Sequence, residues 1–171
     1  MYFGLSEDQI FFQDNVKKFL EDQLTLDTVK KITEGEDDLA KEELHKGIIN
    51  LGINNILVPE EYGGLGLDLL FATAVSQSLG EGVATLPFLG PYIVAPTAIK
   101  YGASDSQKEK LFADMSQNLI NFGIGFSEYF GSRDSSGLNI SDNKVTGKTL
   151  FVLDTDFASH VMIADNKGQI G

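Results

Sequence analysis

The segment from residue 51 to residue 68, LGINNILVPEEYGGLGLD, constrains the fold of this chain more than any other. It carries a short apolar run, then Pro59, and then Gly63, Gly64 and Gly66. Glycine adopts backbone angles that other residues avoid, so a cluster of glycines allows the chain to turn tightly. Apolar residues recur at helical spacing on both sides of the segment. We therefore predict a tight turn that joins two helices.

Helical periodicity covers most of the chain up to residue 117. Ser6 and Gln9 form a capping box, in which each side chain hydrogen-bonds to a free backbone N–H at a helix start. Ser104 and Gln107 form a second capping box, and Asp68 has the chemistry of an N-cap. The helices expected from these signals cover residues 6–24, a weaker stretch to residue 32, and residues 39–51, 68–79 and 104–115.

The uncharged apolar segment Leu86–Ile99 allows two interpretations. It contains Pro87, Pro91 and Pro96, and proline has no N–H for a helical hydrogen bond, so a helix here must be kinked or must start late. An apolar kinked helix can wall a cavity for an apolar ligand. It can equally belong to an ordinary core, and the pattern alone favours the core.

The periodicity changes at Asn118. Residues 121–127 alternate apolar and small residues as a strand does, and further short β-type runs cover residues 138–140, 144–149, 150–153 and 160–164. We therefore predict an α+β fold, with an N-terminal all-α helical bundle over residues 1–117 and a partial antiparallel β-barrel-like domain over residues 118–171. The last turn, residues 166–168, leaves three residues for a returning strand, whereas strands usually have ~5–6. We expect the sequence to be part of a longer protein.

Composition excludes several classes of function. The net charge is −12 and Arg133 is the single arginine, so no basic patch is available to neutralise phosphates and we expect no nucleic-acid binding.

No apolar run reaches the ~20 residues that span a bilayer, and the N-terminus lacks the cationic start of a signal peptide, so we expect no membrane association. Cysteine is absent, which fits a cytoplasmic protein. With His45 and His160 as the two histidines, we expect no metal site.

No self-contained catalytic motif is present. The sequence has no P-loop and no Gly-x-Ser-x-Gly. Gly123 and Gly125 lie within an expected strand rather than at the strand-to-helix turn of a dinucleotide-binding fold. Glu60 and Glu61 are adjacent in an extended segment, where neighbouring side chains point apart, so they make a poor acid/base pair.

Three motifs together resemble the acyl-CoA dehydrogenase family. Residues 59–66, PEEYGGLG, are similar to the family's Pro-Glu-Glu-Tyr-Gly-Gly-x-Gly. Residues 125–134, GFSEYFGSRD, resemble the first strand of its β domain, and residues 146–153, TGKTLFVL, resemble its Gly-x-Lys-x-Trp-Ile-Thr. Spacing alone leaves the glycine cluster as a plain Gly-rich turn, and it is the whole string that points to the family.

The resemblance implies a set of residues in contact with FAD. In the family, backbone and hydroxyl groups of the first β-domain strand bind the flavin ring, which implies flavin contact for Phe126 and Ser127 and both flavin and thioester contact for Ser132. Phe151 takes the position of a tryptophan that packs against the flavin. Leu153 takes a position where a hydroxyl normally contacts the ring. Turn composition alone also allows Ser132 to be a simple turn residue. The sequence departs from the family pattern at three more positions, Tyr129, Arg133 and Thr149.

The resemblance also implies an activity, a substrate and partners. A complete member catalyses the FAD-dependent α,β-dehydrogenation of an acyl-CoA thioester, passes electrons to an electron-transfer flavoprotein and forms homo- or hetero-oligomers. The segment Leu86–Ile99 would wall the acyl pocket, so the implied substrate contacts are Ser132, Leu89, Tyr92, Ile93 and Pro96.

The family's catalytic base is a glutamate of a C-terminal four-helix domain, which this sequence does not contain. We therefore assign no catalytic residue and expect the chain alone to be inactive. The alternative is a degenerate, non-catalytic partner subunit of a heteromer that binds no flavin itself. Arg133 and Leu153 favour that alternative, whereas Ser132 and Phe151 favour the enzyme.

Overall fold

The computed structural model describes residues 4–131 and 137–171. The chain forms two compact units, Met1–Leu86 and Pro87–Gly171. The first unit is helical, and the second begins with helices and continues with short strands, which confirms the predicted fold class. The predicted domain boundary after residue 117 falls inside the second unit, where helices give way to strands, and it stays a prediction.

The first unit is built from four α-helices: α1 (Glu7–Gln23), α2 (Leu26–Glu34), α3 (Asp38–Asn50) and α4 (Leu69–Glu81). The capping box of Ser6 and Gln9 starts α1 as predicted, and Asp68 caps α4 by accepting the N–H of Phe71 at 3.0 Å. The core of this unit consists of aliphatic side chains: Val16, Leu20, Ile32, Leu44, Ile48, Ile53, Ile56, Val58, Ala72, Ala74, Val75 and Leu79.

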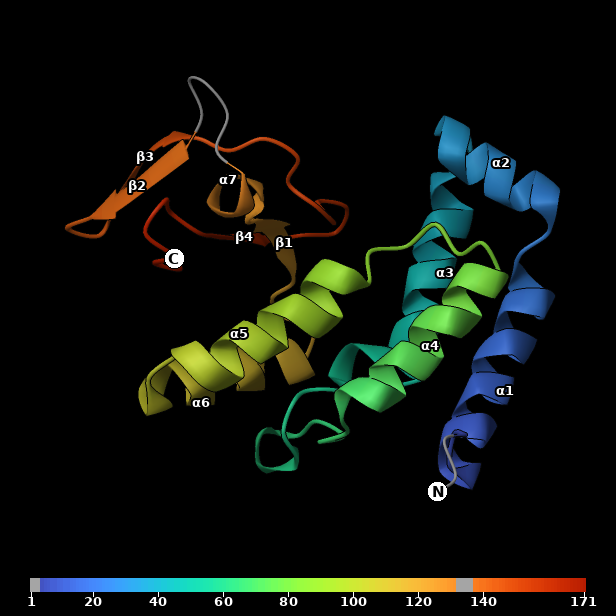
Figure 1. Cartoon of the computed structure of the whole chain (residues 1–171). Helices are drawn as coiled ribbons and strands as arrows, with labels where there is room; N and C mark the ends of the chain where they lie inside the picture. The colour runs from blue at the N-terminus through green and yellow to red at the C-terminus, as the bar shows by residue number, and fades with distance from the viewer. Residues whose placement is uncertain (1–3, 132–136) are drawn as a thin grey trace. The chain divides into compact units, whose positions relative to one another are not determined.

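Helices α1 and α4 lie side by side and run in the same direction (Figure 1). The rings of Phe12 and Phe71 meet edge to face, with centroids 5.9 Å apart. One turn along, the Gln13 side chain donates a hydrogen bond to the Ala74 carbonyl at 2.9 Å. Since contacts advance together along both helices, their C-terminal ends lie close to each other.

The glycine-rich segment forms the predicted tight turn through two short 3₁₀ helices, η1 (Ile53–Asn55) and η2 (Glu60–Tyr62). Backbone N–H groups of residues 64–67 bond back to carbonyls of residues 55–59. Gly63 and Gly66 have φ angles of 85° and 61°, in the left-handed region that favours glycine. At Gly64 the reason is space, because a Cβ there would lie 2.1 Å from the Val58 carbonyl oxygen.

The second unit opens with a π-helical turn, η3 (Leu89–Val94), which continues into α5 (Ala95–Gly102) and then α6 (Asp105–Ser116). The Ala95 N–H bonds to the Gly90 carbonyl, five residues back. Pro96 has no N–H to offer the preceding turn, which is a reason for the irregular helix start that the prolines predicted. Ser104 and Gln107 form the predicted capping box of α6.

The strands of the second unit are β1 (Phe122–Gly125), β2 (Gly137–Ser141), β3 (Lys144–Lys148) and β4 (His160–Ile163), with a short helix α7 (Ser127–Phe130) after β1. β2 and β3 form the expected antiparallel hairpin. β1 and β4 pair in parallel, where we predicted antiparallel pairing. A parallel pair needs a long connection, and α7, the hairpin and residues 149–159 supply it.

The run 150–153 was wrongly predicted as a strand. Phe151 and Asp154 both have a φ of 54°, and these left-handed conformations interrupt an extended segment. Leu153 alone keeps a β-bridge, which it forms with Ile124. Within residues 4–131 and 137–171, no helix has the length and apolar character needed to cross a membrane.

Candidate functional site

Residues 150–153 run antiparallel beside the end of β1. Ile124 and Leu153 exchange both backbone hydrogen bonds at 2.9 Å. The Ser127 hydroxyl, at the start of α7, donates a hydrogen bond to the Leu150 carbonyl, so residues 150–153 stay close to the chain that leads out of β1. Phe126 directly precedes Ser127, and Phe151 directly follows Leu150. The structure therefore brings together four of the five residues predicted to contact flavin, Phe126, Ser127, Phe151 and Leu153.

The fifth predicted residue, Ser132, lies outside the described residues. Its roles in flavin and thioester contact stay predictions. Arg133, which was weighed for the non-catalytic alternative, lies outside the described residues as well.

The surface at this point combines apolar side chains with polar groups of the backbone. The side chain of Phe151 is 70 % exposed and that of Leu153 is 50 % exposed, while Phe126 and Ser127 are half-buried. A positive φ is uncommon for a bulky residue such as Phe151, and strained residues of this kind cluster at functional sites. The arrangement places a largely exposed aromatic side chain in the same stretch of chain as hydrogen-bonding groups.

The four residues predicted to wall the acyl pocket divide into two pairs. Tyr92 and Pro96 are buried in the core of the second unit, as the core interpretation of this segment expected. Leu89 is 52 % exposed and Ile93 is half-buried, so these two side chains reach the surface. Leu89 and Ile93 are therefore the two that a ligand could contact directly, with Tyr92 and Pro96 supporting them from within.

A hydrogen bond that the sequence did not predict joins η3 to the segment of residues 150–154. The Gly90 N–H donates to Asp154 Oδ2 at 2.5 Å. Nearby, burial raises the pKa of the Tyr92 phenol to about 12; a hydrogen bond with Asn121 opposes the shift, and the charge of Asp154 adds to it. No local pattern signals Asp154, because its partner lies 64 residues away in the sequence.

The residues present fit a flavin ring, which has an apolar face and a polar edge. Phe151 offers a ring face, and Ser127 with its backbone neighbours offers polar groups. Thr149 adds a buried hydroxyl, close to Gly125, that has no hydrogen-bond partner among the described residues. A buried polar group left without a partner costs about 1–3 kcal/mol, so a ligand edge that satisfied it would be favoured. Leu153 supplies no hydroxyl, which leaves one side-chain hydrogen bond fewer than the resemblance implied.

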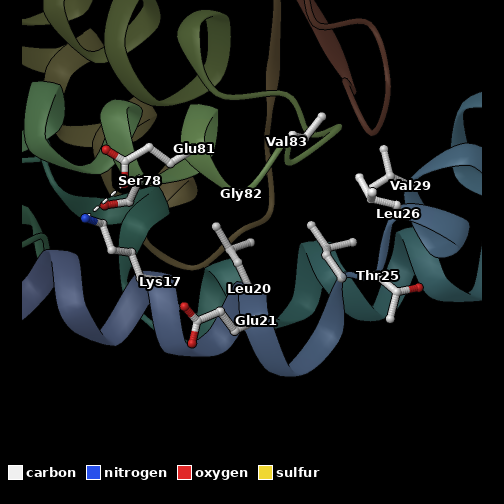
Figure 2. Close-up of a pocket in the computed structure, with 11 residues that line it drawn as sticks. Lys17, Leu20, Glu21, Thr25, Leu26, Val29, Ser78, Glu81, Gly82 and Val83 are labelled. Carbon is white, nitrogen blue, oxygen red and sulfur yellow. Dashed lines mark ion pairs between the residues drawn. The ribbon is translucent and has the colours of Figure 1, made fainter.

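The first unit contains a cavity of about 280 Å³ where the C-terminal ends of α1 and α4 meet the start of α2. Figure 2 shows Leu20 on its floor and Leu26, Val29 and Val83 around it, with the ion pair of Lys17 and Glu81 at one side. None of the predicted site residues that the structure describes lines this cavity.

The charged groups at the cavity satisfy one another. Lys17 Nζ lies 2.9 Å from Glu81 Oε2, and the Gln77 side chain donates to the other Glu81 oxygen at 2.9 Å. The hydrogen bond from Lys17 lowers the pKa of Glu81, and the same bond raises the pKa of Lys17. The Ser78 hydroxyl bonds to the Ala74 carbonyl. These pairings engage Lys17, Glu81 and Ser78 with neighbouring protein groups.

In the part of the chain that the structure describes, no three His, Asp or Glu residues gather as a metal site would require.

Comparisons with known proteins identify the family and the fold. The family model described as "Acyl-CoA dehydrogenase, N-terminal domain" matches residues 6–118. Acyl-CoA dehydrogenase FadE26 of Mycobacterium tuberculosis is 29 % identical over 112 residues, which cover 62 % of this chain and 28 % of that protein. The structure of butyryl-CoA dehydrogenase from Megasphaera elsdenii superposes with a TM-score of 0.70 at 20 % identity, over 98 % of this chain and 47 % of that one. The ChsE4–ChsE5 complex from M. tuberculosis gives a TM-score of 0.68 at 20 % identity, over 96 % of this chain and 43 % of that one. The chain thus spans less than half the length of these relatives.

Proposed function

The chain belongs to the acyl-CoA dehydrogenase family, and we propose that it contributes the helical N-terminal domain and the flavin-facing first part of the β domain to a FAD-dependent enzyme. The reaction is the α,β-dehydrogenation of an acyl-CoA thioester. The complete enzyme passes electrons to an electron-transfer flavoprotein, acts in the cytoplasm and forms an oligomer.

One observation carries the proposal. The antiparallel bridge of Ile124 with Leu153 and the hydrogen bond from the Ser127 hydroxyl to the Leu150 carbonyl hold together the two stretches that contain the residues assigned to the flavin by the family resemblance. These residues come from two segments that are distant in the sequence, so their meeting does not follow from local sequence pattern. The meeting supports a common ligand.

Different residues of this chain would contact the flavin and the acyl chain. Phe126 and Ser127 would hold the polar edge of the flavin ring, and Phe151 would cover a ring face. Leu89 and Ile93 would contact the acyl chain. FAD, when bound, supplies the acceptor for the hydride that leaves the β-carbon of the thioester. The base that removes the α-proton is expected outside this chain, so the described residues bind and orient without transferring a proton.

A second candidate function is a non-catalytic subunit that pairs with an active partner and binds no flavin. Leu153 favours it, because this side chain cannot make the hydrogen bond expected at its position. One relative of similar fold, ChsE4–ChsE5, is a complex of two different chains. Phe151 and Ser127 favour the enzyme over this alternative.

Titration of the purified chain with FAD, followed by flavin fluorescence, separates the two functions. We expect weak binding, since the chain spans less than half the length of its relatives, and we expect Phe151→Ala to weaken it about tenfold, in line with the loss of an aromatic stacking contact. Phe157→Ala is the matched control, because Phe157 is also an exposed phenylalanine with a positive φ of 61°. It should leave the affinity unchanged.

The outcomes are distinct. Binding that depends on Phe151 but not on Phe157 supports the enzyme. No FAD binding at all overturns our proposal in favour of the partner subunit. Reduction of the bound flavin by added butyryl-CoA would contradict the assignment of the base to a region outside this chain. The coding sequence after Gly171 gives an independent check, since a four-helix segment with a suitably placed glutamate supports the enzyme and a stop codon supports the partner subunit.

A further inference from the structure

Asp154 caps the π-helical turn from a distant part of the chain. The first N–H groups of a helix have no partner within the helix, and an acidic side chain at that end is stabilising through hydrogen bonding and charge. In η3 the Gly90 N–H, close to the helix start, is bonded to Asp154 Oδ2 at 2.5 Å. Hydrogen bonds to a carboxylate are shorter and stronger than those between neutral groups.

The backbone of Asp154 is itself fixed in place. It follows Leu153, which is locked to Ile124 by a pair of 2.9 Å hydrogen bonds. Its φ of 54° lies in the left-handed region, which aspartate and asparagine tolerate better than most residues. The backbone that carries this carboxylate is therefore held in place, and it belongs to the same segment as Phe151.

Gly90 permits the close approach of the two elements. A Cβ at this position would lie 3.0 Å from Asp154 Oδ2 and 3.0 Å from Ile124 Cγ1. Both distances are shorter than ordinary van der Waals contact, so with a larger residue at this position the Asp154 and Ile124 side chains or η3 would have to shift by a few tenths of an ångström. Gly90 leaves room for the Asp154 side chain, and the Asp154 carboxylate accepts the Gly90 N–H; we call this contact the Gly90–Asp154 junction.

The turn held by this junction carries most of the proposed acyl wall. Leu89, Tyr92 and Ile93 all belong to η3, and Pro96 follows in the first turn of α5. Asp154 also lies near enough to the buried Tyr92 phenol for its charge to raise the pKa of that group. A substitution of Asp154 should therefore alter the position of the acyl-wall residues, both through the lost hydrogen bond to Gly90 and through the altered surroundings of Tyr92.

We infer that Asp154 is a positioning residue for the acyl wall: its carboxylate ties η3 to the flavin-facing segment 150–154 and so sets how deeply an acyl chain can enter beside the flavin. This inference rests on the proposed function.

Two substitutions separate positioning from general stability. Asp154→Gly removes the acceptor and also relieves the left-handed conformation, so no new strain is added. Asp154→Asn keeps a side-chain oxygen and the tolerance of that conformation. Hydrogen exchange of the Gly90 amide, measured by NMR on the full chain, should accelerate about tenfold or more in Asp154→Gly and should stay near the wild-type rate in Asp154→Asn.

The same spectra contain the internal control. The Met162 amide in β4 and the Ala164 amide, which donates to the Gly125 carbonyl of β1, should keep their protection in Asp154→Gly, and the Tyr92 ring resonances should shift. Unchanged Gly90 protection in Asp154→Gly would overturn the inference. Equal loss of protection at Gly90 and throughout β1 would also overturn it, because the residue would then serve only general stability.

Ligand binding tests the consequence for the acyl wall. In Asp154→Gly the ratio of affinities for butyryl-CoA and octanoyl-CoA should change about threefold or more, which corresponds to a modest part of the free-energy cost of losing a charged hydrogen bond. If the wild-type chain binds neither FAD nor acyl-CoA, the proposed function fails, and the Gly90 exchange rates still decide the role of Asp154. If the wild type binds both, and the ratio and Gly90 protection are unchanged in Asp154→Gly, the inference about Asp154 fails alone.

Discussion

Substitution of Gly64 by alanine should strongly destabilise the first unit. A Cβ at this position would lie 2.1 Å from the carbonyl oxygen of Val58 and 2.5 Å from its carbonyl carbon, whereas ordinary contact begins at 3.4 Å. The atoms in the way belong to the backbone, so they cannot move aside as a flexible side chain would. The Val58 carbonyl also accepts the Gly66 N–H at 2.8 Å, and any displacement of it disturbs that hydrogen bond.

The cost of Gly64→Ala combines two effects. Forcing an extra methyl group into packed surroundings costs about 1–3 kcal/mol, and loss of the hydrogen bond to Val58 adds about 1 kcal/mol. The free energy of unfolding should therefore fall by about 2–4 kcal/mol, which is a large part of the 5–15 kcal/mol that ordinary domains possess. At about 2–4 °C for each kcal/mol in a chain of this size, the Tm falls clearly.

Urea unfolding followed by circular dichroism measures this loss, and Gly80→Ala provides the control. Gly80 is an exposed residue of α4 with nothing within 4 Å of a built Cβ, so alanine there should stabilise the helix by about 0.5–1 kcal/mol. If Gly64→Ala unfolds at the same urea concentration as the wild type, the geometry described for the glycine-rich turn is wrong.

Three further predictions concern strain, packing and charge. Val83 has a φ of 52°, which is costly for a β-branched residue, so Val83→Gly should raise the free energy of unfolding by about 0.5–1 kcal/mol in urea denaturation; a decrease would count against strain there. Phe112 is fully buried, so Phe112→Ala should cost about 3–5 kcal/mol in the same assay, whereas Phe130→Ala at a 79 % exposed position should change little; equal effects would contradict the assigned core. The N–H groups of Gln169 and Lys167 lower the pKa of Asp165 from its ordinary 3.8. Because the folded-state pKa is the lower one, the stabilisation is present above about pH 4 and is lost as the pH falls through the folded pKa, so the Tm difference between wild type and Asp165→Ala should shrink on acidification; a constant difference would exclude this linkage.

The sequence predicted best what depends on neighbouring residues. The capping box at Ser6, the N-cap at Asp68 and the turn at Gly63 and Gly64 are all set by residues a few positions apart, and each one forms as expected. The irregular start of the helix before Pro96 also follows from one missing N–H group.

What the sequence did not predict depends on contacts between distant segments. The parallel pairing of β1 with β4 is decided by a long connection rather than by strand composition. The left-handed conformation of Phe151 has no residue signal, since phenylalanine normally avoids it. The bond from Gly90 to Asp154 joins two residues that no local motif links. The grouping of Phe126, Ser127, Phe151 and Leu153 was predicted only through the family resemblance.

NMR titration of the isotope-labelled chain with FAD tests the central claim most directly, because it reports which residues meet the flavin. We predict that the largest shifts fall on the amides of Phe126, Ser127 and residues 149–153, where the two segments run side by side. Shifts centred on the cavity around Leu20 and Val83, or no shifts at FAD concentrations that saturate the fluorescence signal, would contradict the account.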